Sequence, residues 1–132
     1  TAGKEFGSTT GRPRRCGWFD AVAVRYSGAL SGTTELVITN LDVLRGFSEI
    51  KLATAYRLAD GSTTDHFPAF DLDGATPIYE TLPGFDQNIT GVRAYGDLPA
   101  AAQRFLETVE ARTGLPVKTI SVGPERQQVI LR

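Results

Sequence analysis

The sequence predicts an α/β fold, because segments with helical spacing of apolar residues alternate with short runs of β-forming residues. The helical spacing covers residues 17–30 and 98–114, and the β-rich runs lie within residues 35–67, 77–82 and 116–132. This alternation is typical of helices that pack on a sheet. With 132 residues, 41% of them apolar, and no internal repeat, the chain matches one compact domain or a part of one.

Composition excludes several classes of function. A formal net charge of −1 lacks the excess of basic residues that a nucleic-acid binder needs. No run of 18 apolar residues is present, and the segment that starts at Thr1 lacks the apolar core of a secretion signal, so we expect a cytoplasmic protein without a membrane span. The single Cys16 and the single His66 exclude an intrachain disulfide and zinc or Cys/His chemistry.

A basic loop precedes the first predicted helix. Residues 7–15 read Gly-Ser-Thr-Thr-Gly-Arg-Pro-Arg-Arg, which joins glycines, hydroxyls and guanidinium groups in one segment. Backbone amides and planar arginine forks suit a carboxylate or a phosphate. The spacing differs from the Gly-Lys-Ser/Thr pattern of a Walker A loop. A solvated basic turn is the alternative interpretation.

The first helix is predicted from Gly17 to about Leu30, with Cys16 packed beneath it. A strand at Glu35–Thr39 follows and ends at Asn40-Leu41-Asp42, where ligands commonly bind in open α/β sheets. Asn and Asp most often serve as caps and turn formers, which is one interpretation of this segment. The other is purine recognition, because an ionised Asp accepts two parallel hydrogen bonds from guanine, a match that adenine cannot make.

A hairpin is predicted next. The polarity alternates from residue 50 to residue 57, and Asp60-Gly61 supplies the turn before a second strand within residues 62–67. We expect one face of the hairpin to be exposed, and His66 to be a surface or hydrogen-bonded residue rather than a catalyst. The predicted inner face consists of Ile50, Leu52, Thr54 and Tyr56.

Residues 68–97 are rich in Pro, Gly and Asp and predict a loop with one strand at Pro77–Leu82. A second helix covers residues 98–114, with Pro99 at its first position and Gly114 after its end. Its apolar face consists of Ala102, Phe105, Leu106 and Val109.

Two strands close the chain, at Val117–Val122 and Gln128–Leu131. Between them, Ser121-Val122-Gly123-Pro124 has two interpretations. It is a strand end with a Gly-Pro turn, or a backbone wall against a flat ring.

Six short blocks, in order along the chain, carry a resemblance. They are Glu5-Phe6-Gly7-Ser8-Thr9-Thr10-Gly11-Arg12, Gly17-Trp18-Phe19-Asp20, Asn40-Leu41-Asp42-Val43-Leu44, Pro77-Ile78-Tyr79-Glu80, Leu82-Pro83-Gly84 and Ser121-Val122-Gly123-Pro124-Glu125-Arg126. Each is weak alone, but together their order and spacing resemble about the last third of the adenylosuccinate synthetase family. The absence of Met agrees with a C-terminal segment of such a chain.

The resemblance implies a mixed sheet flanked by helices, as the C-terminal part of a larger P-loop-NTPase-like, GTP-using ligase. In that family GTP, with Mg²⁺, phosphorylates O6 of inosine monophosphate (IMP). L-Aspartate then displaces the phosphate to give adenylosuccinate in AMP biosynthesis, with release of GDP and phosphate. The expected partners are IMP, L-aspartate and GTP, and the whole enzyme is expected to be a homodimer.

The resemblance also assigns binding roles to three segments. Residues 1–16 resemble the loop that closes on substrate, in which Thr9, Thr10 and Arg14 hold the aspartate carboxylates and Arg12 spans aspartate and nucleotide. Asn40–Asp42 resembles the guanine-reading segment, and Ser121–Gly123 resembles its second wall. The implied substrate-binding residues are Ser8, Thr9, Thr10, Gly11, Arg12, Pro13 and Arg14, and the implied GTP-binding residues are Arg14, Asn40, Leu41, Asp42, Ser121, Val122 and Gly123.

One position departs from the family. The family usually has Lys at the position of Asn40, where its aliphatic stem can cover the guanine ring. Asn offers neither the stem nor the charge, so we expect Asp42 to select guanine still, with weaker nucleotide affinity or an altered donor preference.

The family's phosphate loop, its catalytic Asp and His and its magnesium ligands lie in its N-terminal part. We therefore expect no catalytic or metal-binding residue in this segment and no activity from it alone. Two alternatives remain open. One is a relative that uses a 2-aminopurine nucleotide in place of IMP and forms 2-aminoadenylosuccinate, and the other is a non-catalytic nucleotide- or protein-binding module.

Overall fold

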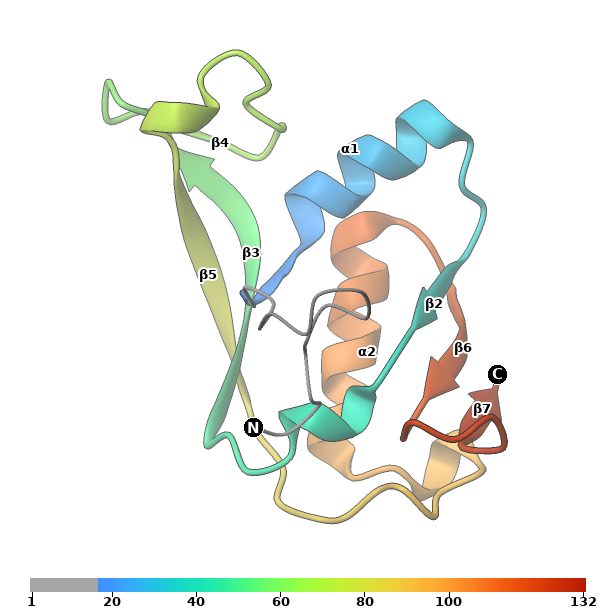
Figure 1. Cartoon of the computed structure of the whole chain (residues 1–132). Helices are drawn as coiled ribbons and strands as arrows, with labels where there is room; N and C mark the ends of the chain where they lie inside the picture. Colours follow the sequence, from blue (N-terminus) through green and yellow to red (C-terminus); the bar gives the residue numbers. More distant parts are fainter. Residues whose placement is uncertain (1–16) are drawn as a thin grey trace, which may run out of the picture.

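The computed structural model describes residues 17–132, in which helices and short strands alternate as predicted (Figure 1). The helices are α1 (Ala21–Ser31) and α2 (Ala100–Thr113), and the 3₁₀ turns are η1 (Leu41–Leu44), η2 (Leu72–Gly74) and η3 (Tyr95–Asp97). The strands are β1 (Phe19–Asp20), β2 (Leu36–Ile38), β3 (Glu49–Arg57), β4 (Thr63–Thr64), β5 (Thr76–Pro83), β6 (Val117–Ser121) and β7 (Val129–Leu131).

The described strands form two small mixed sheets, where the resemblance implies one mixed sheet. In the first, β3 pairs in parallel with β1 and antiparallel with both β4 and β5. In the second, β6 pairs in parallel with β2 and antiparallel with β7. Helix α2 contacts both β5 and β6 and lies between the two sheets (Figure 1), so each sheet packs on the helix rather than on the other.

Helix α1 begins at Ala21, four residues after the predicted start at Gly17. The difference arises because Phe19 and Asp20 pair with β3 before the helix begins. The Asp20 carboxylate then caps the helix by accepting the Ala23 N–H at 2.9 Å, and its other oxygen accepts the Tyr56 hydroxyl. Burial raises the pKa of Tyr56, and this hydrogen bond raises it further.

Helix α2 confirms the predicted apolar face, since Ala102, Phe105, Leu106 and Val109 are all buried. Pro99 caps the helix from just outside it instead of occupying the first helical position. The helix ends at Gly114, which adopts the left-handed conformation that glycine takes without a Cβ penalty.

The predicted hairpin is confirmed between β3 and β4, but most of β3 pairs with another strand. Strand β3 pairs with β5 along most of its length, from Glu49 opposite Pro83 to Arg57 opposite Thr76, while β4 supplies only two residues. The strand expected within residues 77–82 is confirmed as part of β5. A register shift between Ala53 and Ala55 breaks the predicted alternation, which buries Ala53 and leaves Thr54 outside the core.

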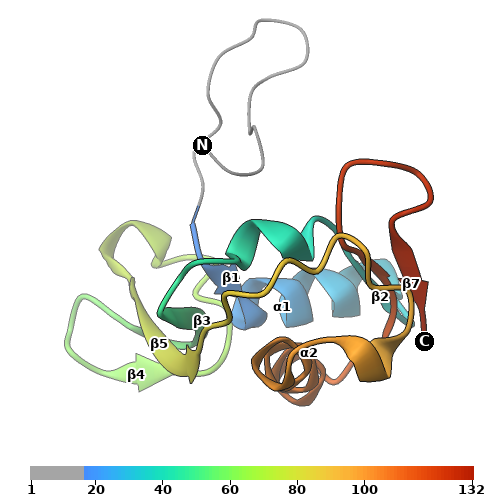
Figure 2. The same cartoon turned by 90° about the horizontal axis from the view of Figure 1, so that it is seen from below.

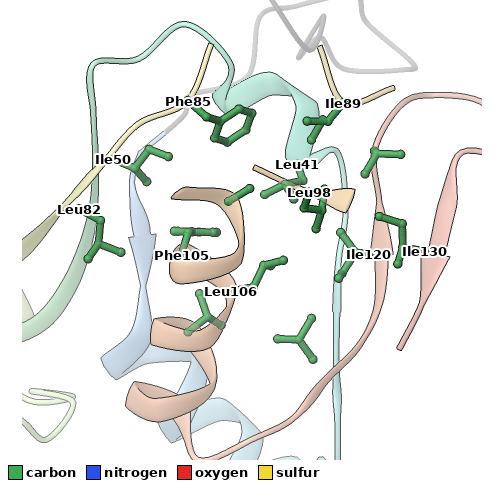
Figure 3. Close-up of a cluster of buried hydrophobic side chains, with 14 of the residues drawn as sticks. Leu41, Ile50, Leu82, Phe85, Ile89, Leu98, Phe105, Leu106, Ile120 and Ile130 are labelled. Atoms are coloured by element: carbon green, nitrogen blue, oxygen red, sulfur yellow. The ribbon is translucent and has the colours of Figure 1, made fainter. Parts of the chain in front are cut away.

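One apolar core joins α2 to both sheets and to the segment between β5 and α2 (Figure 3). That segment was predicted as loop, and it is largely irregular, yet Phe85, Ile89 and Leu98 pack into the core. Leu41 of η1 and Val122, just after β6, belong to the same cluster. The two segments that resemble nucleotide-binding segments are therefore built on the core. No helix among residues 17–132 is long and apolar enough to cross a membrane.

Candidate functional site

The parallel pairing of β2 with β6 brings two candidate segments to one sheet edge. Ile38 at the end of β2 lies opposite Ile120 of β6. Because parallel strands end at the same edge, Asn40–Asp42 after β2 and Ser121–Gly123 at the end of β6 become neighbours, and η1 contacts β6. In the view of Figure 2, η1 and the β6–β7 turn lie on the same side of the molecule.

The turn after β2 is held by its backbone and by the core. Asn40 is left-handed, with φ 55° and ψ 47°, a conformation that Asn adopts more readily than most residues. Its carbonyl accepts the Val43 N–H at 3.1 Å, and the Asp42 carbonyl accepts the Arg45 N–H at 3.2 Å. The Leu41 side chain is 1% exposed and fixes the turn against the core.

The Asp42 carboxylate is not used by this turn. Its Oδ1 is buried and has no hydrogen-bond partner among residues 17–132, and η1 has no side-chain cap hydrogen bond. Leaving a buried acceptor unpaired is costly, so nearly all such groups in folded proteins have a partner. No described residue therefore supplies a donor to this oxygen, and the carboxylate does not cap the turn.

The second segment offers a backbone surface and one hydroxyl. Ser121 Oγ donates to the Gly123 carbonyl at 2.9 Å, and the Val122 N–H donates to the Gln128 carbonyl at 2.8 Å. The side chains of Val122 and Leu41 are both within the core. A ligand at this edge could therefore meet those two residues only through their backbones.

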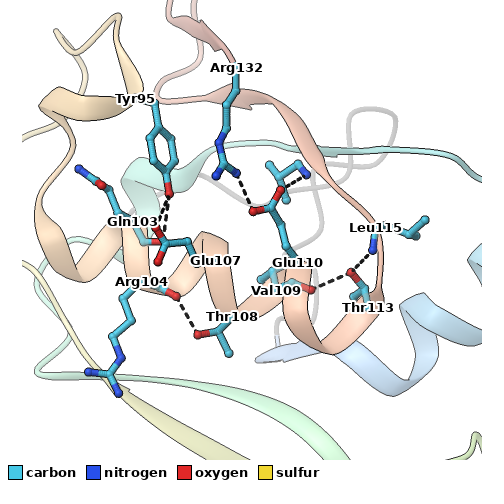
Figure 4. Close-up of polar contacts among 11 residues, drawn as sticks. Tyr95, Gln103, Arg104, Glu107, Thr108, Val109, Glu110, Thr113, Leu115 and Arg132 are labelled. Atoms are coloured by element: carbon cyan, nitrogen blue, oxygen red, sulfur yellow. Dashed lines mark hydrogen bonds and ion pairs between the residues drawn. The ribbon is translucent and has the colours of Figure 1, made fainter.

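Strand β6 is fixed at its other end by a polar cluster (Figure 4). Glu110 accepts the Val117 N–H at 2.8 Å and pairs with Arg132 at 2.7 Å, and the Arg132 guanidinium lies 4.2 Å from the centre of the Tyr95 ring. Burial alone would raise the pKa of Glu110, but the Val117 N–H and the Arg132 guanidinium lower it overall. The candidate site therefore lies at the end of β6 opposite the end that this polar cluster fixes.

Sequence reasoning missed Gln128, whose side chain covers Gly123 and holds the β6–β7 turn. In the sequence, only Gly123 indicated a close contact in this turn, because a glycine at a strand end permits the close approach of another group. The identity of that group depends on a tertiary contact that no local pattern encodes.

The remaining predicted residues divide into two groups. The substrate-loop residues, Ser8 to Arg14, and also Cys16 lie outside the described residues. His66 is confirmed at the surface, with a side chain that is 90% exposed. Between residues 17 and 132, no group of three or more His, Cys, Asp or Glu side chains could hold a metal ion.

A separate hollow of about 620 Å³ lies beyond the outer ends of the paired strands β3 and β5, lined by residues 58–60 and 69–74. None of the residues from the β2–β6 edge lines it. The Asp60 carboxylate in its wall is already paired with Ser62. No side chain in its wall has a buried, unpaired oxygen like that of Asp42.

By fold, the described residues form an α/β protein with a candidate ligand site at the carboxyl edge of a parallel strand pair. The family model of adenylosuccinate synthetase matches residues 1–130. The chain belongs to the adenylosuccinate synthetase family, whose members are ligases of AMP biosynthesis.

Individual relatives agree with this assignment. The adenylosuccinate synthetase of Alkaliphilus metalliredigens is 49% identical over 98% of this chain, which covers 31% of that protein. That of Polaromonas naphthalenivorans is 52% identical over 99% of this chain, which covers 30% of it. The structure of fully ligated adenylosuccinate synthetase from Plasmodium falciparum superposes with a TM-score of 0.92 at 30% identity, over 98% of this chain and 32% of that one. The chain thus spans about a third of the length of these relatives.

Proposed function

We propose that this chain supplies the guanine-reading and aspartate-binding part of a GTP-dependent adenylosuccinate synthetase. The observation that carries the proposal is the buried, unpaired Oδ1 of Asp42 at the carboxyl edge of β2 and β6. Family membership supports the reaction, and the position of Asp42 supports the role of this edge within it.

The chemistry of Asp42 suits guanine. An ionised carboxylate accepts two parallel hydrogen bonds, and guanine offers two adjacent donors, its N1–H and its 2-amino group. Adenine presents an acceptor at N1, which would leave the carboxylate unpaired in a buried place. Discrimination then arises from the cost of the wrong pairing as much as from the strength of the right one.

The neighbouring residues shape the slot for the base. The Ser121–Gly123 backbone forms its second wall, with the Ser121 hydroxyl held by the Gly123 carbonyl. Asn40 occupies the position where the family usually has Lys, so in our proposal the ring is covered by a shorter, uncharged side chain. We expect this chain to bind GTP more weakly than a relative with Lys there.

In the proposed reaction, a nucleotide held at the β2–β6 edge reacts with substrates held by the loop of residues 1–16. GTP phosphorylates O6 of IMP, and the amine of L-aspartate then displaces the phosphate. In the proposal, Thr9, Thr10 and Arg14 hold the aspartate carboxylates through hydroxyls and a bidentate guanidinium, and Arg12 spans aspartate and nucleotide.

Magnesium is part of the proposal only because the family uses it in phosphoryl transfer. When bound, Mg²⁺ neutralises the charge that develops on the transferring phosphoryl group. The described residues do not fit a magnesium site, because they contain no cluster of carboxylates that could hold a metal. We accordingly expect the 132-residue chain by itself to form no adenylosuccinate.

The test compares GTP with inosine triphosphate in a full-length synthetase that carries this chain. Inosine triphosphate keeps N1–H and lacks the 2-amino group, so it forfeits one hydrogen bond to the carboxylate. We expect kcat/KM to be about 10- to 100-fold lower with inosine triphosphate, the range for losing one hydrogen bond to a charged group. Equal use of both nucleotides would contradict guanine reading at this site.

A further inference from the structure

We propose that Gln128 is a positioning residue for guanine, because it sets the place of the Gly123 backbone in the second wall. This inference rests on the proposed function of the β2–β6 edge. Gln128 itself lies behind the wall, at the start of the segment that leads into β7.

Gln128 ties the β6–β7 turn together through four hydrogen bonds. Its side-chain Oε1 accepts the Glu125 N–H at 2.8 Å, and its Nε2 donates to the Thr90 carbonyl at 3.5 Å. Its backbone N–H donates to the Glu125 carbonyl at 3.0 Å, and its carbonyl accepts the Val122 N–H at 2.8 Å. One residue therefore connects both limbs of the turn to each other and to the segment before α2.

The Gln128 side chain also explains the glycine at position 123. A Cβ on Gly123 would lie 2.5 Å from Cδ and 2.8 Å from Nε2 of Gln128, and closer still to Oε1. The φ angle of Gly123 lies outside the left-handed region, so the backbone conformation does not require glycine. In this arrangement the Gln128 amide occupies the space that a Cβ at position 123 would need.

The contact between Gln128 and Gly123 affects the proposed guanine site in two ways. The Gly123 carbonyl accepts the Ser121 hydroxyl, so a displaced Gly123 also releases that hydroxyl. On the other side, Thr90 follows Ile89, which packs in the same core cluster as Leu41, the neighbour of Asp42. Gln128 thus fixes the second wall relative to the segment that carries the Asp42 carboxylate.

The experiment measures steady-state kinetics of Gln128→Ala in a full-length synthetase that carries this chain. We expect KM for GTP to rise about tenfold, the effect of losing one net hydrogen bond, while kcat and KM for IMP stay within about twofold. Gln127→Ala is the matched control, because this neighbouring glutamine is exposed and should leave all three constants unchanged. A parallel rise of KM for GTP and IMP, or an unchanged KM for GTP, would overturn the assignment.

Two further variants distinguish a loss of guanine positioning from a general loss of folding. Gln128→Glu keeps the acceptor for the Glu125 N–H and the cover over Gly123 but loses the donor to Thr90, so its KM for GTP should rise less than that of Gln128→Ala. Gly123→Ala should displace the Gln128 side chain and raise KM for GTP, and it should add nothing in the Gln128→Ala background. Additive effects would show that Gly123 acts independently of Gln128 and would contradict the inference.

Asp42→Asn in the same assay separates this inference from the proposed function. If Asp42→Asn leaves the nucleotide preference unchanged, guanine reading at this edge fails and the role of Gln128 fails with it. If Asp42→Asn alters the preference while Gln128→Ala leaves KM for GTP unchanged, only the assignment of Gln128 is wrong.

Discussion

The turn after β2 and the outer turn between β3 and β4 both follow a strand and both contain an aspartate, yet only one of the two carboxylates is paired within its turn. Asp60 in the outer turn is exposed and accepts both the N–H and the hydroxyl of Ser62, at 2.9 and 2.5 Å. Asp42 after β2 has a buried oxygen without a partner among the described residues. The residue type is therefore not the signal. A carboxylate that its own turn satisfies forms the turn, whereas one with a buried, unpaired oxygen is the basis of our proposal that the β2–β6 edge binds guanine.

The largest effect should appear at Leu41, with Leu72 of η2, the 3₁₀ turn before β5, as an exposed comparison. Leu41 and Leu72 are the first residues of η1 and η2, but Leu41 is 1% exposed and Leu72 is 48% exposed. We expect Leu41→Ala to lower the free energy of unfolding by about 2–5 kcal/mol, the range for truncating a buried leucine. Leu72→Ala should change it by less than about 0.5 kcal/mol. Urea unfolding of both variants measures this, and equal losses would show that η1 is not built on the core.

Asp20 provides a third case, in which a partly buried carboxylate is fully paired. Its two oxygens accept the Ala23 N–H and the Tyr56 hydroxyl. We expect Asp20→Ala to lower the free energy of unfolding by about 1–2 kcal/mol, because it removes a helix cap and leaves a buried hydroxyl without its acceptor. Tyr56→Phe in the Asp20→Ala background should then cost little more, which a double-mutant cycle of thermal unfolding would check.

Asp42 should behave in the opposite way. Asn at this position keeps the size and removes the negative charge beside an oxygen that is buried without a partner among the described residues, so we expect Asp42→Asn to raise the free energy of unfolding of the ligand-free chain by about 1 kcal/mol. The same thermal unfolding assay serves, with Asp60→Asn as the matched control. A clear loss of stability in Asp42→Asn would place its carboxylate among the structural ones.

The smallest effect concerns the pH dependence of Asp60. The hydrogen bonds from Ser62 lower the pKa of Asp60 below its ordinary value, so its contribution to stability is present above about pH 4 and disappears as the pH falls through the lowered pKa. The stability difference between wild type and Asp60→Asn should therefore be small near neutral pH and vanish in acid. Unfolding curves collected from pH 6 to about pH 2 would check this, and a difference that grows toward acid would have the wrong sign.

Much of the fold follows from local patterns. The helix at residues 100–113 and the terminal strands are predicted by periodicity and by Gly114. The pairing of β2 with β6 is not, because about 80 residues separate the two strands and register is decided by tertiary packing. The register shift near Thr54 cannot be predicted from the sequence either, because the alternation of apolar and polar residues is the same with or without a bulge.

The candidate site is likewise predictable from the sequence only in part. Asn40–Asp42 and Ser121–Gly123 can be proposed from their place at strand ends and from the resemblance. The packing of Leu41 and Val122 into the core follows only from the three-dimensional structure. So does the finding that, within residues 17–132, Asp42 has the one buried side-chain oxygen without a partner. Gln128 carries no sequence signal, because its role depends on two neighbours, Gly123 and Thr90, that are distant from each other in the chain.

The account rests most directly on Asp42, and one measurement tests it: kcat/KM for GTP and for xanthosine triphosphate, in a full-length synthetase with Asp42 and in its Asp42→Asn variant. The substitution exchanges one acceptor for a donor, so GTP use should weaken by roughly 2–4 kcal/mol. Xanthosine triphosphate carries a C2 carbonyl that can accept from the new amide, so it should lose less or gain, and the preference between the two nucleotides should shift toward it. An unchanged preference for GTP over xanthosine triphosphate would contradict the account and return Asp42 to the role of a turn-forming residue.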